Sequence, residues 1–203
     1  MICRIRTGAK RPIDHYTSST LDGRTIGRFA PVLIRFVSPL LITETTNKNM
    51  PNPLIDTWNI HNRINLYLLD AIDKTSLDSH SASKGRSVGE QFAHLHNVRL
   101  MWLKSAAPEL LTGLQKIEAP QAVDHKLLRS SLVDSGKAIA SLLEQSLETG
   151  GKIKGFKPHA EAFLGYLISH ESHHRGQIAL SLKQAGKPLD KKIAYGLWEW
   201  GVR

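Results

Sequence analysis

The chain has 203 residues, of which 41% are hydrophobic and 22% charged, as is typical of a soluble globular protein with one core. A formal net charge of +9 suggests a nucleic-acid binder. However, residues 1–49 hold eight Lys/Arg against three Asp/Glu, so they supply more than half of the excess positive charge. Residues 50–203 carry no basic stripe with interleaved aromatics, and we expect no nucleic-acid partner. The single cysteine, Cys3, excludes an internal disulfide and is compatible with a cytoplasmic protein.

Residues 1–49 differ in character from the rest of the chain. Their one apolar run, from Phe29 to Ile42, is interrupted by prolines and an arginine, so it neither spans a membrane nor forms the core of a secretory signal. A transit peptide, a disordered extension and sequence upstream of the true start are the interpretations that stay open. Because Met50 directly precedes a well-patterned helical region, we divide the chain into an extension (1–49) and a helical domain (50–203), with no membrane partner.

The first half of the domain predicts two helices. From Pro53 to about Thr75, apolar residues recur at three- and four-residue steps, and a proline suits the first turn of such a helix. Residues 78–85 are polar and small, which predicts a loop. The sequence Ser87-Val88-Gly89-Glu90 has the capping-box pattern and predicts the start of a second helix, which ends before Pro108.

The second half predicts two more helices. A long apolar stripe indicates a third helix from about Gln121 to Thr149, where two glycines end it. Pro158 is expected to open a fourth helix, which ends at Gly186-Lys187-Pro188.

The whole pattern predicts an all-α protein. No strand or hairpin signal is evident in residues 50–203, and four long amphipathic helices with connections of moderate length are typical of a four-helix bundle. The N-terminal extension is expected to be poorly structured. The aromatic tail Trp198-Glu199-Trp200 is expected to pack across the end of the bundle.

The strongest functional signal is the run His170-Glu171-Ser172-His173-His174. A spacing of four residues places His170 and His174 on one helix face, one turn apart, where two neutral imidazoles can bind one transition-metal ion. His173 then points toward a flank, and Glu171 lies about 100° around the helix from His170. The competing interpretation is a polar patch in the core or a basic surface.

A third histidine on a neighbouring helix would complete a metal site with an open position for water or substrate. His94 is the candidate, but His96 lies about 200° around the same helix, and periodicity alone does not decide which of the two faces the centre. His61, on the first helix, is expected to be a core histidine with a hydrogen-bonded partner.

The same run also meets the letter pattern of the zinc metalloproteases, with Glu171 following the first histidine. That hypothesis requires a third ligand further along the chain and a substrate cleft beside a strand. The sequence signals neither of these features.

Several segments together resemble the DinB-like (DinB/YfiT) superfamily of four-helix-bundle metalloproteins. The run from His170 to Ile178 is similar to the signature of that superfamily, and the run from Ser87 to Leu95 is similar to its second-helix segment. The stretches 182–188 and 195–200 are similar to its C-terminal part. The resemblance covers about residues 53–201.

This resemblance implies a three-histidine site for a divalent metal ion (zinc, nickel or iron) with His94, His170 and His174 as ligands, which favours His94 over His96. It also implies a relationship to S-transferases and isomerases, which use low-molecular-weight thiols such as bacillithiol, mycothiol or glutathione. We therefore predict a divalent-metal-binding protein that acts as a thiol-dependent S-transferase or related metalloenzyme. The alternative is a non-catalytic metal-binding or stress-response interaction module.

Three further residues are candidates for binding substrate: Gln177, just after the histidine cluster, and Asn62 and Trp58 on the first helix. Arg175 is expected to pair with a carboxylate such as Glu171, and contact with an acidic thiol cofactor is its alternative role. The expected partner is a small-molecule substrate or thiol, and a homodimer is compatible with a bundle of this kind.

Overall fold

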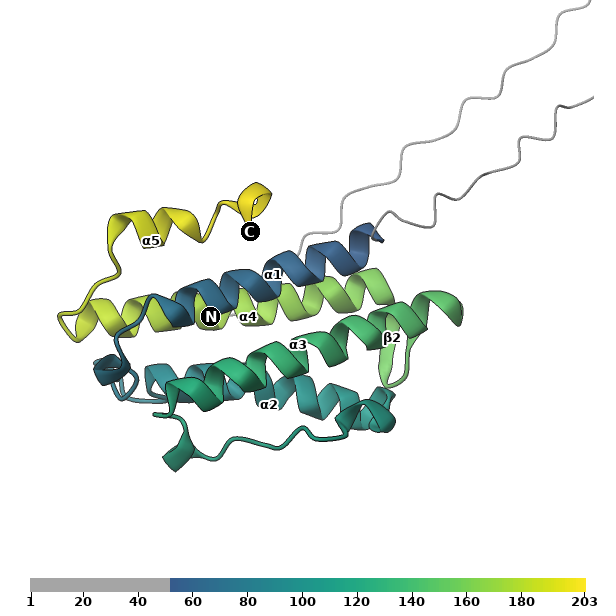
Figure 1. Cartoon of the computed structure of the whole chain (residues 1–203), viewed down its shortest axis with the longest axis horizontal. Helices are drawn as coiled ribbons and strands as arrows, with labels where there is room; N and C mark the ends of the chain where they lie inside the picture. The colour runs from purple at the N-terminus through teal and green to yellow at the C-terminus, as the bar shows by residue number, and fades with distance from the viewer. Residues whose placement is uncertain (1–51) are drawn as a thin grey trace, which may run out of the picture. The chain divides into compact units, whose positions relative to one another are not determined.

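The computed structural model describes residues 52–203, so the predictions for residues 1–49 concern a part of the chain outside this range. Four long helices form a bundle (Figure 1) in which α3 and α4 each pack against both α1 and α2. The prediction of an all-α four-helix bundle is confirmed. The helices are α1 (Pro53–Asp70), α2 (Val88–Ala106), α3 (His125–Glu148), α4 (Ala160–Gln184) and α5 (Lys191–Gly196). The shorter elements are η1 (Lys74–Ser76), η2 (Pro108–Leu111), η3 (Ala119–Gln121), η4 (Trp200–Val202), β1 (Lys152–Ile153) and β2 (Phe156–His159).

The start of α2 is fixed by the predicted capping box. Ser87 Oγ accepts a hydrogen bond from the backbone N–H of Glu90 (3.2 Å), and the Glu90 carboxylate accepts one from the backbone N–H of Ser87 (2.7 Å). These two bonds satisfy amide groups that the first helical turn leaves without partners. The cap fixes the residue at which α2 begins, and His94 lies one helical turn after Glu90.

The first and third helices are each about one turn shorter than the sequence pattern predicts. α1 ends at Asp70, because Asp73 accepts a hydrogen bond from the second residue of η1 and starts that separate turn. α3 begins only at His125, because Asp124 is its N-cap and accepts from the backbone N–H of Leu127 (3.0 Å). In both places a short acidic side chain bonds the nearby backbone, which favours a cap over helix continuation.

A short hairpin joins α3 to α4, so the prediction that residues 50–203 contain no hairpin was wrong here. Strands β1 and β2 pair antiparallel, and the turn passes through Gly155 at φ +85°. Only Ile153 of the two strands is fully buried. Strands of two and four residues are too short to show an alternating apolar pattern.

The hairpin also displaces the start of α4. Pro158, expected to open the helix, lies in β2, and the N-cap is His159, whose Nδ1 accepts from the backbone N–H of Ala162 (3.3 Å). The far end follows the prediction, because α4 stops at Gln184 and Gly186 takes a positive φ of +73°.

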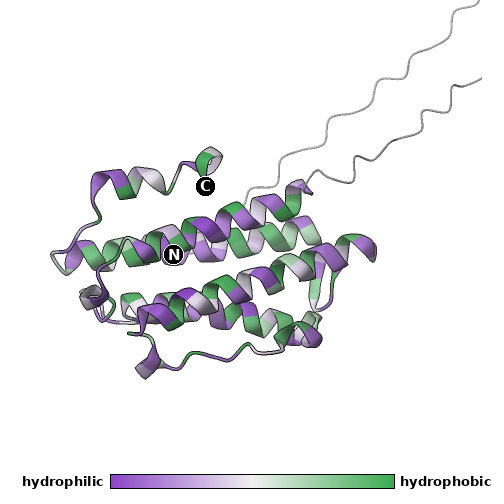
Figure 2. Ribbon diagram, viewed as in Figure 1, coloured by the Kyte–Doolittle hydropathy of each residue, from purple (hydrophilic) through white to green (hydrophobic). Residues whose placement is uncertain are grey.

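The apolar core consists of two clusters with a polar layer between them. One cluster is built around Leu68 and Phe92, the other around Trp58 and Phe163. Figure 2 shows hydrophobic and hydrophilic residues alternating along each long helix, as expected when one face of each helix is buried. The polar layer comes from the middle of the four helices: His61, Asn65, Arg99, Ser135 and Glu171, all buried. Within residues 52–203, no helix has the length and continuous apolar character that crossing a bilayer requires.

The sequence predicts a C-terminal tail that packs across the end of the bundle. In the structure the tail instead lies along α1. The Arg203 guanidinium stands 3.7 Å from the ring centroid of Tyr67, and Arg63 donates to the backbone carbonyl of Arg203 (2.7 Å). Trp200 approaches His61 with ring centroids 6.3 Å apart, whereas Trp198 is 81% exposed. The tail therefore covers the side of α1 through its last residues.

Candidate metal centre

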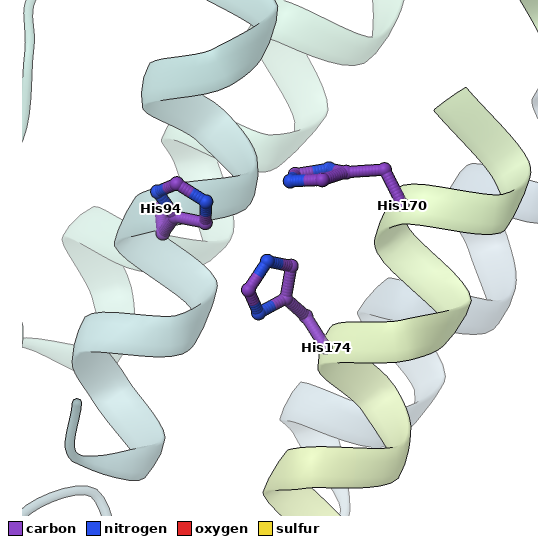
Figure 3. Close-up of side chains that lie close together, drawn as sticks. All are labelled: His94, His170 and His174. Atoms are coloured by element: carbon purple, nitrogen blue, oxygen red, sulfur yellow. The ribbon is translucent and has the colours of Figure 1, made fainter. Parts of the chain in front are cut away.

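Three histidines from two neighbouring helices converge between α2 and α4. His94 comes from α2 and His170 and His174 from successive turns of α4, and Figure 3 shows the three rings directed at one another. One nitrogen of each ring can be chosen so that all three lie within 4.8 Å of one another. The ring centroids are 4.6 to 5.3 Å apart. The i, i+4 spacing on α4 thus does bring both imidazoles to one place, together with an imidazole from the neighbouring helix.

The donor set and its spacing fit one transition-metal ion. Ligand nitrogens about 2.0–2.1 Å from a tetrahedral ion lie about 3.4 Å from one another. The separation of up to 4.8 Å is wider than this by an amount that small side-chain rotations can close. His94 and His170 are only partly buried, which leaves room for such rotations.

All three imidazoles are held in the neutral form that binds metal. Burial, Arg86 and His170 lower the pKa of His94 to about 4. Burial and the neighbouring histidines, with a smaller effect of Arg86, lower the pKa of His174 to about 4. The pKa of His170 is also lowered, chiefly by burial. Each ring therefore keeps a nitrogen lone pair at neutral pH.

A glutamine from α2 orients the most buried of the three rings. His174 Nδ1 lies 2.5 Å from Gln91 Oε1. Because an amide oxygen can only accept, His174 donates through Nδ1 and keeps its Nε2 lone pair free for a ligand. Metal-binding histidines commonly donate their second N–H to an oxygen in this way.

The environment of His170 is different. Tyr166 stacks on its ring, with centroids 6.1 Å apart and planes at 18°. Nδ1 of His170 is buried and has no hydrogen-bond partner among residues 52–203. A buried nitrogen without a partner is costly, and a bound ligand would relieve that cost.

The other two candidate histidines lie outside the cluster. His96 is buried, with its ring nitrogens 3.0 Å from the carbonyl oxygen of Ser131 and 2.9 Å from that of Gln115. His173 is exposed and lies 2.9 Å from the side chain of Gln177. The structure therefore shows that His94, and not His96, joins the cluster, a choice that periodicity alone does not make.

Glu171 points away from the cluster into the buried polar layer. Arg99 binds both of its oxygens at 2.8 Å, while His61 Nε2 and Asn65 Nδ2 lie 2.9 and 2.6 Å from Oε2. Burial raises the pKa of Glu171, but the ion pair with Arg99 and these hydrogen bonds outweigh it and hold the pKa well below its usual range. The expectation for His61 is confirmed. In a zinc protease the carboxylate of the general base faces the metal site. Glu171 is held away from the histidine cluster and does not match that arrangement.

Arg175 does not form the expected ion pair with Glu171. Its guanidinium donates to Asn65 Oδ1 and Ser172 Oγ, both at 2.7 Å. The charge of Glu171 is instead balanced by Arg99 from the neighbouring helix.

The three predicted substrate-binding residues lie in different surroundings. Trp58 is completely buried and donates from Nε1 to the carbonyl oxygen of Gly136 (2.8 Å). Asn62 also lies against Gly136, and its Oδ1 is buried without a hydrogen-bond partner among the described residues. Gln177 alone lies on the flank of the cluster, where it lines a hollow of about 240 Å³ together with Gln91.

Two residues at this centre were not identified from the sequence. Gln91, which orients His174, lies three residues before His94, and that spacing on a helix could have indicated it. Arg86 immediately precedes the capping box of α2 and lines a hollow of about 300 Å³ together with His94. Its charge contributes to the lowered pKa of all three clustered histidines.

Comparison with known proteins places this fold and cluster in a family. The sequence profile of the DinB family matches residues 45–198, which is most of the chain. The chain belongs to the DinB family. A solved crystal structure, that of a DinB-like protein from Bacillus cereus, superposes with a TM-score of 0.51 at 20% sequence identity and covers 68% of this chain and 93% of that protein. No protein of curated function matches the sequence. The fold and the family are thereby established, and the histidine cluster is compatible with metal binding.

Proposed function

We propose that this DinB-family protein binds one divalent transition-metal ion, zinc, nickel or iron, through His94, His170 and His174. The observation that carries the proposal is the convergence of three neutral imidazoles from two helices, one of them oriented by a glutamine. Three imidazoles leave at least one coordination position for a small ligand.

Metal analysis of full-length protein, purified without a histidine tag, tests this function. Wild-type protein is expected to carry close to one ion per chain, and His94→Ala, His170→Ala and His174→Ala are each expected to lose most of it. The matched control is His173→Ala, an exposed histidine of the same helix that lies outside the cluster. Equal metal content in all four variants, or none in the wild type, would contradict the proposal.

We further propose that the bound ion serves a thiol-dependent transfer of the S-transferase type. A divalent ion lowers the pKa of a coordinated thiol and so supplies a thiolate at neutral pH. In the transfer the thiol loses its proton, its sulfur forms a bond to an electrophilic carbon, and the leaving group departs with the electron pair of the bond that breaks. The cluster is only partly buried, and His94 lines one hollow while Gln91, which holds His174, lines another, which supports access for small molecules.

Turnover of monochlorobimane with bacillithiol, mycothiol or glutathione separates this function from its alternative, a non-catalytic metal-binding or stress-response module. A transferase is expected to accelerate loss of chloride with one of these thiols, and removal of the metal is expected to abolish the acceleration. Metal binding without thiol-dependent turnover favours the non-catalytic module. The cytoplasmic location and the homodimer stay predictions, the latter to be tested by light scattering.

A further inference from the structure

A buried ion pair joins the two helices that supply the histidine cluster. Arg99 of α2 donates from Nε and Nη2 to the two carboxylate oxygens of Glu171 of α4, both at 2.8 Å. Both side chains are buried, with exposures of 0% and 1%. Arg99 follows His94 within one and a half turns of α2, and Glu171 directly follows His170 on α4. The pair therefore spans the same helix–helix contact as the cluster.

The two partners are also held by the rest of the bundle. Nη1 of Arg99 donates to the backbone carbonyl of Leu132 of α3 (3.0 Å), and its guanidinium carbon lies 4.8 Å from the ring centroid of Trp58 of α1. Nε2 of His61 of α1 lies 2.9 Å from Oε2 of Glu171. The ion pair is thus in contact with all four long helices, and α4 cannot move along α2 without breaking it.

The stability of the core does not by itself account for such a pair. The free energy needed to take two charges out of water largely offsets their attraction, and apolar side chains of similar volume stabilise a core as well or better. The best attested role of a buried polar group between helices is to fix their register. Apolar contacts are non-directional and tolerate sliding, whereas a fork of two parallel hydrogen bonds forms in one register only.

Metal binding by residues of two helices requires a fixed register. Ligand atoms must lie within about 0.5 Å of their productive positions, and successive residues of a helix differ in height by about 1.5 Å. A slide of α4 along α2 by less than one residue would therefore carry His170 and His174 away from an ion bound by His94.

We propose that Arg99 and Glu171 are positioning residues of the metal centre. Their ion pair holds α4 against α2 in the one register in which the three clustered histidines share an ion. This inference rests on the proposed metal binding. Because Glu171 points away from the cluster, the pair acts on the ion only through the helices that carry the ligands.

Titration of the full chain with Co²⁺ tests this role, because the visible absorption of the ion depends on the number and arrangement of its ligands. The variant Arg99→Met/Glu171→Gln removes both charges together, so no lone charge stays buried, and the amide oxygen can still accept from His61. It is expected to bind Co²⁺ at least about tenfold more weakly, with a shifted absorption band. The thermal midpoint of the metal-free variant is expected to stay close to that of the wild type.

Two further variants separate register from general effects on the polar layer. His61→Phe is the matched control, because it removes a contact to the same carboxylate from α1 and leaves the link between α2 and α4 intact. It is expected to keep the wild-type Co²⁺ affinity within about twofold. Arg99→Lys keeps the buried charge but replaces the fork by a point charge, and it is expected to weaken Co²⁺ binding by about three- to tenfold.

Wild-type Co²⁺ affinity in both Arg99 variants, or an equal loss in His61→Phe, would overturn the inference and leave the metal centre standing. If the double variant does not fold, the comparison of Arg99→Lys with His61→Phe decides. Failure of the wild type to bind Co²⁺ would contradict the metal centre and this inference with it.

Discussion

The amide oxygen of Gln91 on α2 lies 2.5 Å from Nδ1 of His174 on α4, and both side chains are buried. This bond fixes which nitrogen of the imidazole carries the proton and therefore which one is free. It also joins the two helices that supply the histidine cluster.

Replacing Gln91 by Leu is expected to weaken metal binding by about 10–100-fold without unfolding the protein, because His174 loses the oxygen that orients it. Competition with a chromophoric chelator measures the affinity. Gln177→Leu is the matched control, since that amide contacts His173 and none of the three clustered rings. An unchanged affinity in Gln91→Leu would show that the bond does not support the ligand.

Replacing Glu171 by Gln is expected to lower the free energy of unfolding by about 3–5 kcal/mol, because the guanidinium of Arg99 stays buried without its counter-charge. Urea denaturation followed by circular dichroism measures this loss. Glu161→Gln, at an exposed carboxylate near the start of the same helix, is the control and is expected to leave the midpoint unchanged. A loss below about 1 kcal/mol in Glu171→Gln would argue against a tightly coupled polar layer.

Two glycine substitutions are expected to act in opposite directions. A Cβ at Gly89 would lie 1.9 Å from the backbone oxygen of Ala122, so Gly89→Ala must displace the connection before α3 and is expected to cost at least about 2 kcal/mol. A Cβ at Gly165 in α4 meets no atom within 4 Å, so Gly165→Ala is expected to stabilise the protein by about 0.5–1 kcal/mol. Thermal denaturation of the two variants side by side checks both, and equal midpoints would disprove the packing of α2 described above.

The metal-free protein is expected to lose stability as pH falls from about 7 to 5. The pKa values of His94 and His174 are lowered to about 4, and burial also lowers those of His61, His96 and His170 below the value of 6.5 expected of the unfolded chain. Below about pH 6.5 the unfolded chain therefore binds more protons than the folded one, which favours unfolding.

Thermal midpoints in the presence of a chelator, measured at several pH values, test this dependence. The double variant His94→Ala/His174→Ala removes two of the five histidines and is expected to show a shallower slope. A midpoint that is flat between pH 7 and 5, or rises, would mean that these rings are protonated in the folded protein.

The sequence predicted the helices and the histidine pair because both follow from local periodicity. The step from His170 to His174 is a property of any α-helix, and the capping box at Ser87 is a pattern within four residues. Whether His94 or His96 joins the pair depends on how α2 is rotated against α4, which no local pattern contains. Resemblance to the family supplied that answer, and the structure agrees with it.

The partners of buried charges were less predictable for the same reason. Arg175 lies one turn from Glu171 and was the natural partner by spacing, yet the carboxylate is bound by Arg99 from another helix. Tertiary packing decides which of the two guanidinium groups is buried beside the Glu171 carboxylate. The short hairpin was missed because its pairing depends on where α3 ends and α4 begins.

The two helices that supply the histidine cluster are separated along the chain by the whole of α3 and the hairpin. One cation held by His94, His170 and His174 would therefore act as a cross-link that closes a long loop of polypeptide, comparable to a disulfide but reversible by a chelator instead of a reductant. The stability of the domain would then depend on the supply of free metal around it, because occupancy favours the folded chain by mass action. Removal of that metal would take away the link between α2 and α4 together with any chemistry that depends on the ion.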